Sequence, residues 1–267
     1  IWGSTQDPLR PGESVIVELD GQQSIATVDE NGSWSLQLDP RRAGGPYELV
    51  IESKKGRQTL SDVLIGDVFL CSGQSNMEMT VVRARNSWAE VEGASNDRIR
   101  MTKVERATSA QPEASFLEPL TWEPATRETV GDWSAVCYFF AREIQKHMDV
   151  PIGLIDSSWG GSDIRAWMSA DSLGEIGGYE EALESVRLFA IDESAAQEHF
   201  GTSWEDWWRR SSEPGTIEPW RPETGTSWSM APETLGNWKT WGRPELATHD
   251  GLVWYRGIVE VAAEHVD

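Results

Sequence analysis

The feature that most constrains the fold is a nearly uninterrupted apolar run at residues 63–71, followed at once by a polar turn that contains Gly73. Such a run is typical of a strand that is covered on both faces. A second apolar run, residues 150–155, follows a segment at residues 138–148 whose apolar residues have helical spacing. Strand, helix and strand in this order predict a parallel sheet in an α/β architecture. The pattern allows two caps for the helix, Asp132 or Ser134.

The first sixty residues follow a different pattern. They contain three short runs in which apolar and polar residues alternate, at residues 14–19, 33–38 and 47–52. These runs are separated by turn signals, namely Asp20-Gly21, Asn31-Gly32 and Gly44-Gly45-Pro46. Such pairs favour the tight turns of β-hairpins, so a small antiparallel β-sandwich is predicted here. Asn31-Gly32-Ser33 also matches a glycosylation sequon, but the tight turn is the stronger interpretation.

Charge and cysteine usage exclude some classes of function. The chain has 23 Lys and Arg against 44 Asp and Glu, a formal charge of -21 that repels nucleic acids and anionic lipids. No run approaches the roughly 18 apolar residues of a membrane helix. Cys71 and Cys137 lack metal-type spacing and are interpreted as two separate buried thiols. A disulfide between them stays open, since it requires Cα atoms within about 7 Å.

Residues 171–245 are rich in tryptophan. The cluster comprises Trp204, Trp207, Trp208, Trp220, Trp228, Trp238 and Trp241. A disordered linker would rarely hold so many aromatic residues. Packing of the indoles in a folded segment is the favoured interpretation, and stacking of sugars on exposed indoles is the alternative.

The motif Gly73-Gln74-Ser75-Asn76-Met77 has the properties of a nucleophile turn. A hydrolase nucleophile stands at the end of a rigid strand, on a turn that exposes its oxygen and presents backbone N–H groups to the developing oxyanion. Here Gly73 permits a tight turn, and residues 76–79 can begin the next helix. The alternative is an ordinary strand-to-helix turn in which Ser75 caps the helix. The motif alone leaves both interpretations open.

A second glycine-containing turn, residues 156–163, follows the other predicted strand. Ligands of open α/β sheets bind at the carboxyl ends of the strands, where paired glycines such as Gly160 and Gly161 let the backbone approach a ligand. Their other role would be a simple turn into residues 164–168. Two such turns after successive strands favour the catalytic interpretation.

Two long motifs, residues 66–78 and 151–169, resemble the sialate O-acetylesterase family of SGNH hydrolases in order and spacing. Upstream, residues 1–3 and 32–34 resemble the β-sandwich that precedes the catalytic domain in longer members. The resemblance implies an SGNH, flavodoxin-like three-layer α/β/α domain with a parallel sheet, preceded by a small antiparallel β-sandwich. It also implies a carbohydrate esterase that acts on acetylated carbohydrate and uses no metal or other cofactor.

The resemblance also assigns roles to residues. Ser75 takes the nucleophile position, and its backbone N–H would serve the oxyanion hole. Gly160 or Gly161 takes the place of the family's oxyanion glycine, and Gly161 is favoured. Substrate contacts are expected from the residues that surround these groups, Gln74, Asn76, Gly160 and Ser162.

The sequence departs from the family in several places. Ser162 stands where threonine is usual and Arg165 where an acidic residue is common. The family's oxyanion asparagine motif and its late Asp-x-x-His motif are both missing. The four histidines, interpreted as surface residues, are His147, His199, His249 and His265. The pair His249-Asp250 is rejected as part of a triad because neighbouring residues of a strand point to opposite faces.

The base histidine is therefore expected outside this chain. Residues 251–261 are predicted to form a strand, and residues 254–256 resemble the first strand of a β-domain inserted into longer members. The expected division is residues 1–61 as the sandwich, 62–235 as an incomplete SGNH domain and 236–267 as the start of the insertion. On this interpretation the chain is a fragment, completed by a C-terminal remainder or a second fragment of the same polypeptide.

The resulting hypothesis is a serine esterase that removes O-acetyl groups from sialic acid or from an acetylated polysaccharide through an acetyl-enzyme on Ser75. The alternative is a catalytically inactive carbohydrate-binding protein on the same scaffold. Family habit and the start at Ile1 instead of Met predict a secreted, periplasmic or otherwise extracytoplasmic protein.

Overall fold

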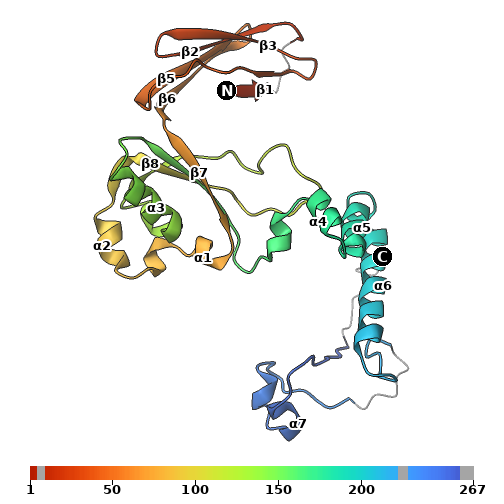
Figure 1. Ribbon diagram of the computed structural model, residues 1–267. Helices are drawn as coiled ribbons and strands as arrows, with labels where there is room; N and C mark the ends of the chain where they lie inside the picture. Colours follow the sequence, from red (N-terminus) through yellow and green to blue (C-terminus); the bar gives the residue numbers. More distant parts are fainter. Residues whose placement is uncertain (5–9, 222–227, 259–267) are drawn as a thin grey trace. The chain divides into compact units, whose positions relative to one another are not determined.

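The computed structural model describes residues 1–4, 10–221 and 228–258 (Figure 1). The chain forms two compact units, Ile1–Glu193 and Ser194–Asp267. No helix within the described residues is long and apolar enough to cross a membrane.

The first unit begins with two antiparallel sheets. A four-stranded sheet has the order β3-β2-β5-β6, and a short two-stranded sheet pairs β1 with β4. The strands are β1 Trp2–Ser4, β2 Ser14–Leu19, β3 Gln22–Thr27, β4 Ser33–Ser35, β5 Gly44–Ser53 and β6 Gly56–Ile65. Both sheets contribute to one apolar cluster, which contains Val15, Val17, Leu19 and Leu49 of the larger sheet and Trp34 of the smaller one.

The predicted turns of this region have mixed outcomes. Asp20 and Gly21 both have positive φ, 52° and 77°, as a two-residue hairpin turn between β2 and β3 requires. The turn at Asn31-Gly32 is also present. The predicted turn at residues 44–46 is wrong, because these residues begin β5, where the pairing with β6 shifts register. Glycine and proline are tolerated at such strand irregularities as well as in turns.

The apolar run at residues 63–71 is divided between two sheets. Its first part ends β6, and its second part belongs to β7, Asp67–Gly73. Gly66 separates them, and a Cβ atom at this position would overlap the carbonyl oxygen of Pro151. The prediction of one continuous strand was therefore wrong, because the chain passes from one sheet to the other at this glycine.

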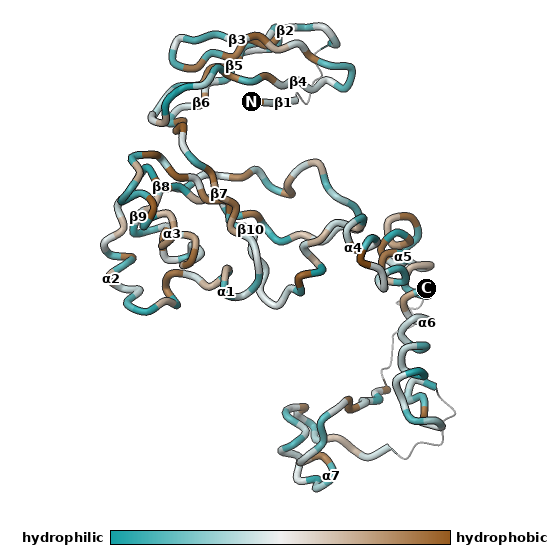
Figure 2. Tube along the Cα trace, viewed as in Figure 1, coloured by the Kyte–Doolittle hydropathy of each residue, from teal (hydrophilic) through white to brown (hydrophobic). Residues whose placement is uncertain are grey.

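A mixed sheet with the order β7-β10-β8-β9 follows. Its further strands are β8 Ser95–Lys103, β9 Glu123–Thr126 and β10 Ile152–Ser158. Strand β10 is parallel to both β7 and β8, whereas β9 is antiparallel to β8. The parallel strand pair predicted from the two apolar runs is thus present, and Figure 2 shows hydrophobic stretches along β7 and β10.

Helix α3, Ala135–Gln145, packs on this sheet. Of the two expected caps, Ser134 is the one used, since its hydroxyl accepts a hydrogen bond from the N–H of Cys137 over 3.3 Å. The helix and the sheet share an apolar cluster that includes Ala141, Leu154 and Ile99. Polar turns and shorter helices lead to and from these elements: α1 Ser75–Glu78, η1 Val81–Arg83, α2 Ser87–Glu92, η2 Val130–Asp132, η3 Ile164–Trp167, α4 Ala170–Ile176 and α5 Glu180–Phe189.

Cys71 of β7 and Cys137 of α3 are joined in a disulfide, with Cα atoms 6.1 Å apart. The interpretation as two separate thiols was wrong. Cys71 lies on the face of β7 that α3 covers, and both residues belong to the cluster between helix and sheet. The bond therefore ties the strand that precedes Ser75 to the helix beneath it.

The second unit contains α6 Glu193–Ser211, η4 Trp238–Thr240 and α7 Pro244–Ala247. The indole rings of Trp204, Trp208, Trp220 and Trp254 all contact one another, with centroids 5.6 to 6.0 Å apart. These four residues are called the tryptophan tetrad below. Their mutual contacts favour the packing interpretation of the tryptophan-rich segment.

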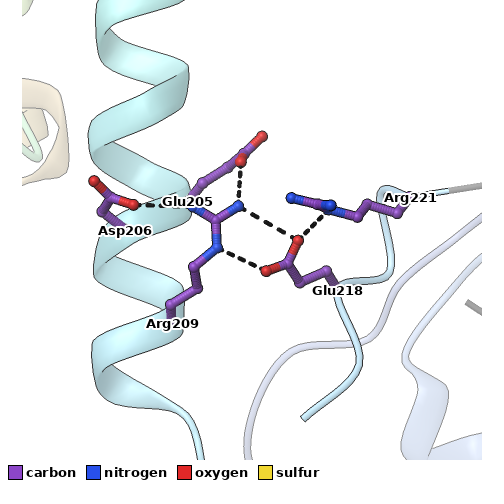
Figure 3. Close-up of polar contacts among 5 residues, drawn as sticks. All are labelled: Glu205, Asp206, Arg209, Glu218 and Arg221. Carbon is purple, nitrogen blue, oxygen red and sulfur yellow. Dashed lines mark hydrogen bonds and ion pairs between the residues drawn. The ribbon is translucent and has the colours of Figure 1, made fainter. Parts of the chain in front are cut away.

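An ion-pair network lies beside the tetrad in sequence (Figure 3). Arg209 of α6 bonds Glu205 and Asp206 of its own helix and also Glu218 on the following loop, with a distance of 2.7 Å from Nε to Glu218 Oε1. Glu218 also pairs with Arg221.

Residues 251–258 form no strand, although residues 251–261 were predicted to form one. Residues 259–261 lie outside the described part of the chain.

Candidate active site

Ser75 lies immediately beyond the carboxyl end of β7 and is exposed. It is the first residue of α1, whose N-cap is Gln74. The side-chain Oε1 of Gln74 accepts hydrogen bonds from the Ser75 N–H, over 2.9 Å, and from the Ser75 hydroxyl, over 2.7 Å. The alternative in which Ser75 serves as the helix cap is therefore wrong. Within the described residues, its hydroxyl hydrogen-bonds only to the side chain of Gln74, which can rotate away.

The second glycine turn lies beside Ser75. Strand β10 pairs with β7 up to Ser158 and Gly73, and the Trp159 N–H then donates to the Gly73 carbonyl oxygen over 2.9 Å. The two strand ends therefore stay adjacent as they enter their turns. A Cβ atom on Gly160 would lie 3.6 Å from the Cα of Ser75, so the backbones of the two turns are nearly in contact.

Gly161 has a left-handed backbone conformation that favours glycine. The turn closes with a hydrogen bond from the Ser162 N–H to the Trp159 carbonyl oxygen, over 3.3 Å, and Gly161 has φ +81°. A positive φ at the third residue is the mark of a type II turn. The space around Gly161 is open: apart from its two chain neighbours, no atom of the described residues lies within 4 Å of where its Cβ would be.

The backbone amides of Gly160 and Gly161 differ in their hydrogen bonding. The Gly160 N–H donates to Glu78 Oε2 over 2.8 Å. The Gly161 N–H has no hydrogen-bond partner among the residues that the structure describes. Of the two candidates for the oxyanion donor, Gly161 is thus the one whose amide is free.

The remaining predicted substrate contacts differ in their freedom. The side chain of Asn76 is exposed and makes no hydrogen bond within the described part of the chain. The Ser162 hydroxyl donates to the Trp159 carbonyl oxygen over 2.7 Å and accepts from Trp167 Nε1 over 2.9 Å. Ser162 is thus engaged within its own turn, while Asn76 is available to a ligand.

Arg165, which replaces an acidic residue usual in the family, is paired with Asp163. Its Nε and one terminal nitrogen each lie 2.8 Å from an oxygen of the Asp163 carboxylate. These hydrogen bonds, with a further one from the Arg165 backbone N–H, hold the pKa of Asp163 well below its usual range. The turn therefore carries the Asp163 carboxylate, which is bound to the guanidinium of Arg165.

The first unit supplies no histidine near Ser75. His147 follows the C-terminal end of α3, whereas the N-terminal end of that helix contacts α1 through Ser134 Oγ, 2.6 Å from the Met77 carbonyl oxygen. The eleven residues of α3 span roughly 16 Å, too far for a shared proton. Of the remaining histidines, His199 and His249 belong to the second unit, and His265 lies outside the described residues.

The side chains of His249 and Asp250, which were rejected as part of a catalytic triad, bind different partners. The ring Nε2 of His249 lies 3.1 Å from the Leu252 carbonyl oxygen, and the carboxylate of Asp250 binds Lys239 Nζ over 2.7 Å.

Two charged residues at the site, Glu78 and Arg106, were not predicted from the sequence. Glu78 lies three residues after Ser75 on α1 and pairs with Arg106, which follows β8. The guanidinium of Arg106 lies over the indole of Trp159, 5.5 Å from the ring centroid. The alternation of Ile99 and Met101 with polar residues was the available signal for β8, and it would have placed Arg106 beyond a third strand end.

A cavity of about 550 Å³ lies at the opposite edge of the same sheet. It is lined by Asp67 and Ile152, the first residues of β7 and β10, and by Arg100 and Trp122. Because Ser75 follows the other end of β7, this cavity is not part of the nucleophile site.

The comparison with known families agrees with this geometry. Residues 65–196, which contain both turns, match the family described as carbohydrate esterase, sialic acid-specific acetylesterase. These residues belong to the sialic acid-specific acetylesterase family. The resemblance predicted from the two long motifs is confirmed.

Individual members of this family show the same relation. The chain is 38% identical to human sialate O-acetylesterase over 194 residues, which cover 66% of this chain and 36% of the human protein. It is 35% identical to the mouse sialate O-acetylesterase over 194 residues, 66% of this chain and 35% of that protein. The crystal structure of a carbohydrate acetylesterase from Xanthomonas citri aligns with a TM-score of 0.61 at 39% identity, covering 65% of this chain and 39% of that one. The chain thus spans little more than a third of the length of these acetylesterases.

Proposed function

We propose that this chain carries the nucleophile of a serine esterase that removes O-acetyl groups from sugars. The Ser75 Oγ attacks the acetyl carbonyl, the bond from that carbonyl carbon to the sugar oxygen breaks, and water then hydrolyses the acetyl-enzyme. The observation that carries the proposal is the close approach of Gly160 to Ser75, which brings the turn with the unbonded Gly161 amide beside the turn with the exposed Ser75.

Two backbone donors would stabilise the oxyanion. One is the Gly161 N–H, and the other is the Ser75 N–H once the acetyl oxygen replaces Gln74 Oε1 as its acceptor. Asn76 and the amide nitrogen of Gln74 are then available to the sugar, together with the backbone of Gly160 and Ser162.

The general base is a histidine outside this chain, in a C-terminal remainder or a second fragment of the same polypeptide. Two observations support this proposal. His147 lies far from α1, and the chain spans about a third of the length of the acetylesterases that it matches. A serine without its base loses most of its reactivity, so an isolated piece of this extent would turn over acetyl esters very slowly.

We infer the finer architecture from the same observations. We propose three domains, at residues 1–61, 62–235 and 236–267. We also propose a three-layer α/β/α arrangement that follows a β-sandwich. Helix α3 covers one face of the mixed sheet, while Val68 and Leu70 on the other face of β7 are 59% and 68% exposed. Parallel sheets ordinarily bury both faces, which supports a second helical layer.

An extracytoplasmic location is proposed for the same protein. The Cys71–Cys137 disulfide supports it, because such bonds persist in oxidising compartments and are rare in the cytosol.

The test uses the full-length natural polypeptide and compares Ser75→Ala with Ser72→Ala, a serine of the same motif that lies within β7. Turnover of p-nitrophenyl acetate should fall at least about 10⁴-fold in the first variant and little in the second. A panel of O-acetylated sialic acids and acetylated polysaccharides would identify the sugar. Unchanged turnover in Ser75→Ala overturns the assignment, and sugar binding without turnover in the natural protein supports the inactive binding protein instead.

A further inference from the structure

Glu78 connects the nucleophile turn with the glycine turn. It lies on α1, one helical turn after Ser75, and its Oε2 accepts the Gly160 N–H over 2.8 Å. The same carboxylate forms an ion pair with Arg106, whose guanidinium lies over the indole of Trp159. One carboxylate thus bridges the segments that follow β7, β8 and β10.

The fit between Glu78 and the glycine turn is close. A Cβ atom on Gly160 would overlap the Glu78 carboxylate, so only glycine permits this contact. The Glu78 side chain is 26% exposed and therefore largely withdrawn from water, which strengthens its bond to a backbone donor. Because this bond uses the Gly160 amide, the Gly161 amide is the donor of the pair that has no partner among the described residues.

The charge of Glu78 creates a problem for an esterase. The transition state of ester cleavage places negative charge on an oxygen beside Ser75, and a carboxylate one helical turn away would repel it. Arg106 compensates this charge by direct pairing, and the Trp159 ring supports the guanidinium from one face. Glu78 can therefore accept the hydrogen bond from Gly160 while Arg106 reduces the repulsion between the Glu78 carboxylate and the oxyanion.

We propose that Glu78 is a positioning residue that holds the Gly160–Gly161 turn against Ser75, so that the Gly161 N–H serves the oxyanion, and that Arg106 neutralises its charge. This inference rests on the proposed function. It predicts that the hydrogen bond and the charge of Glu78 have separable effects on kcat.

Four variants of the full-length polypeptide separate these effects. Glu78→Ala removes the hydrogen bond and should lower kcat for p-nitrophenyl acetate roughly 10²-fold with little change in KM, since displacement of a catalytic group by about 1 Å costs that much. Glu78→Gln retains an acceptor for the Gly160 N–H and should retain most of kcat. Arg106→Ala leaves the carboxylate unpaired and should lower kcat about tenfold or more. Adding Glu78→Gln to Arg106→Ala should restore kcat, because it removes the uncompensated charge.

The control is Glu143→Gln, which changes an exposed carboxylate at the far end of α3, paired with Lys146, and should leave kcat unchanged. Circular dichroism of each variant identifies any that fail to fold. If Glu78→Ala does not fold, the comparison of Arg106→Ala with its double variant still decides the question. Wild-type kcat in Glu78→Ala, or a double variant no better than Arg106→Ala, overturns the positioning role.

Failure of the inference is distinct from failure of the proposed function. If Ser75→Ala is inactive and both Glu78 and Arg106 variants are fully active, the esterase assignment stands and the positioning role is wrong. If Ser75→Ala is as active as the natural protein, both are wrong.

Discussion

The Trp159 N–H, one residue after β10, donates to the carbonyl oxygen of Gly73, the last residue of β7, over 2.9 Å. This bond closes the parallel ladder at the point where the two turns begin. It explains why segments more than eighty residues apart in sequence present Ser75 and the glycine pair at the same edge of the sheet. Changes in the glycine turn should therefore affect activity through geometry.

The backbone of Gly161 supplies the first prediction. Alanine is strained at φ +81° by about 1–2 kcal/mol, whereas asparagine tolerates this region better. Because nothing crowds the position, the cost arises from the backbone alone. Urea unfolding should show Gly161→Ala to be less stable than Gly161→Asn, and equal stability of the two variants would contradict the left-handed conformation.

The disulfide supplies a second prediction. Cys71 and Cys137 are separated by 66 residues, and closing a loop of this length lowers the entropy of the unfolded chain enough to stabilise the fold by about 4 kcal/mol. Replacing both cysteines by alanine should reduce the free energy of unfolding by about this amount. A direct check is alkylation with iodoacetamide in denaturant: no adduct should appear in the mass spectrum unless reductant is added first, and two adducts without reductant would contradict the bond.

A third prediction concerns the contact of Asp62 with Arg100. Asp62 has φ +62°, and its carbonyl and carboxylate oxygens accept hydrogen bonds from Arg100 over 2.8 and 2.7 Å. The Arg100 side chain is only 15% exposed. Asp62→Ala loses the side-chain bond and strains the backbone, so it should cost about 2 kcal/mol in urea unfolding. Asp62→Asn keeps an acceptor and tolerates this φ, so it should cost clearly less, and an equal cost for both variants would refute the explanation.

The sequence predicts the parts of this fold that depend on local chemistry. The hairpin at Asp20-Gly21, the Ser134 cap and the strand end before Ser75 follow from turn residues, capping and apolar runs. Strand β8 escaped prediction because only Ile99 and Met101 mark it among polar residues. The disulfide depends on which face of β7 meets α3, which the spacing of two cysteines cannot reveal.

The site was predictable to a similar extent. Ser75 and the glycine pair stand in recognisable turns, whereas the Glu78–Arg106 pair depends on the adjacency of three strand ends. Tertiary pairing of this kind leaves no periodic signal in the sequence.

The Arg209 network supplies a prediction on pH. Hydrogen bonds from Arg209, followed by its charge and that of Arg221, lower the pKa of Glu218 below its ordinary value. The folded state therefore binds the proton of Glu218 less readily than the unfolded state, so the network stabilises the fold above the ordinary glutamate pKa and loses this contribution as the pH falls through the lowered pKa of Glu218. Arg209→Gln should be less stable than the natural protein at pH 7, and this difference should shrink as the pH falls below the ordinary glutamate pKa. A difference that is undiminished at pH 3 would show that Arg209 acts through packing.

Variants of the tryptophan tetrad distinguish a role in packing from a role in sugar binding. The indole N–H groups of Trp208, Trp220 and Trp254 are buried and have no hydrogen-bond partner among the described residues. Trp220→Phe removes one such unsatisfied donor and keeps an aromatic ring, so it should change the free energy of unfolding little. Trp220→Ala removes the ring contacts and should cost about 3 kcal/mol. If both variants unfold like the natural protein but lose affinity for acetylated sugars, the tetrad is a binding surface and the packing interpretation is wrong.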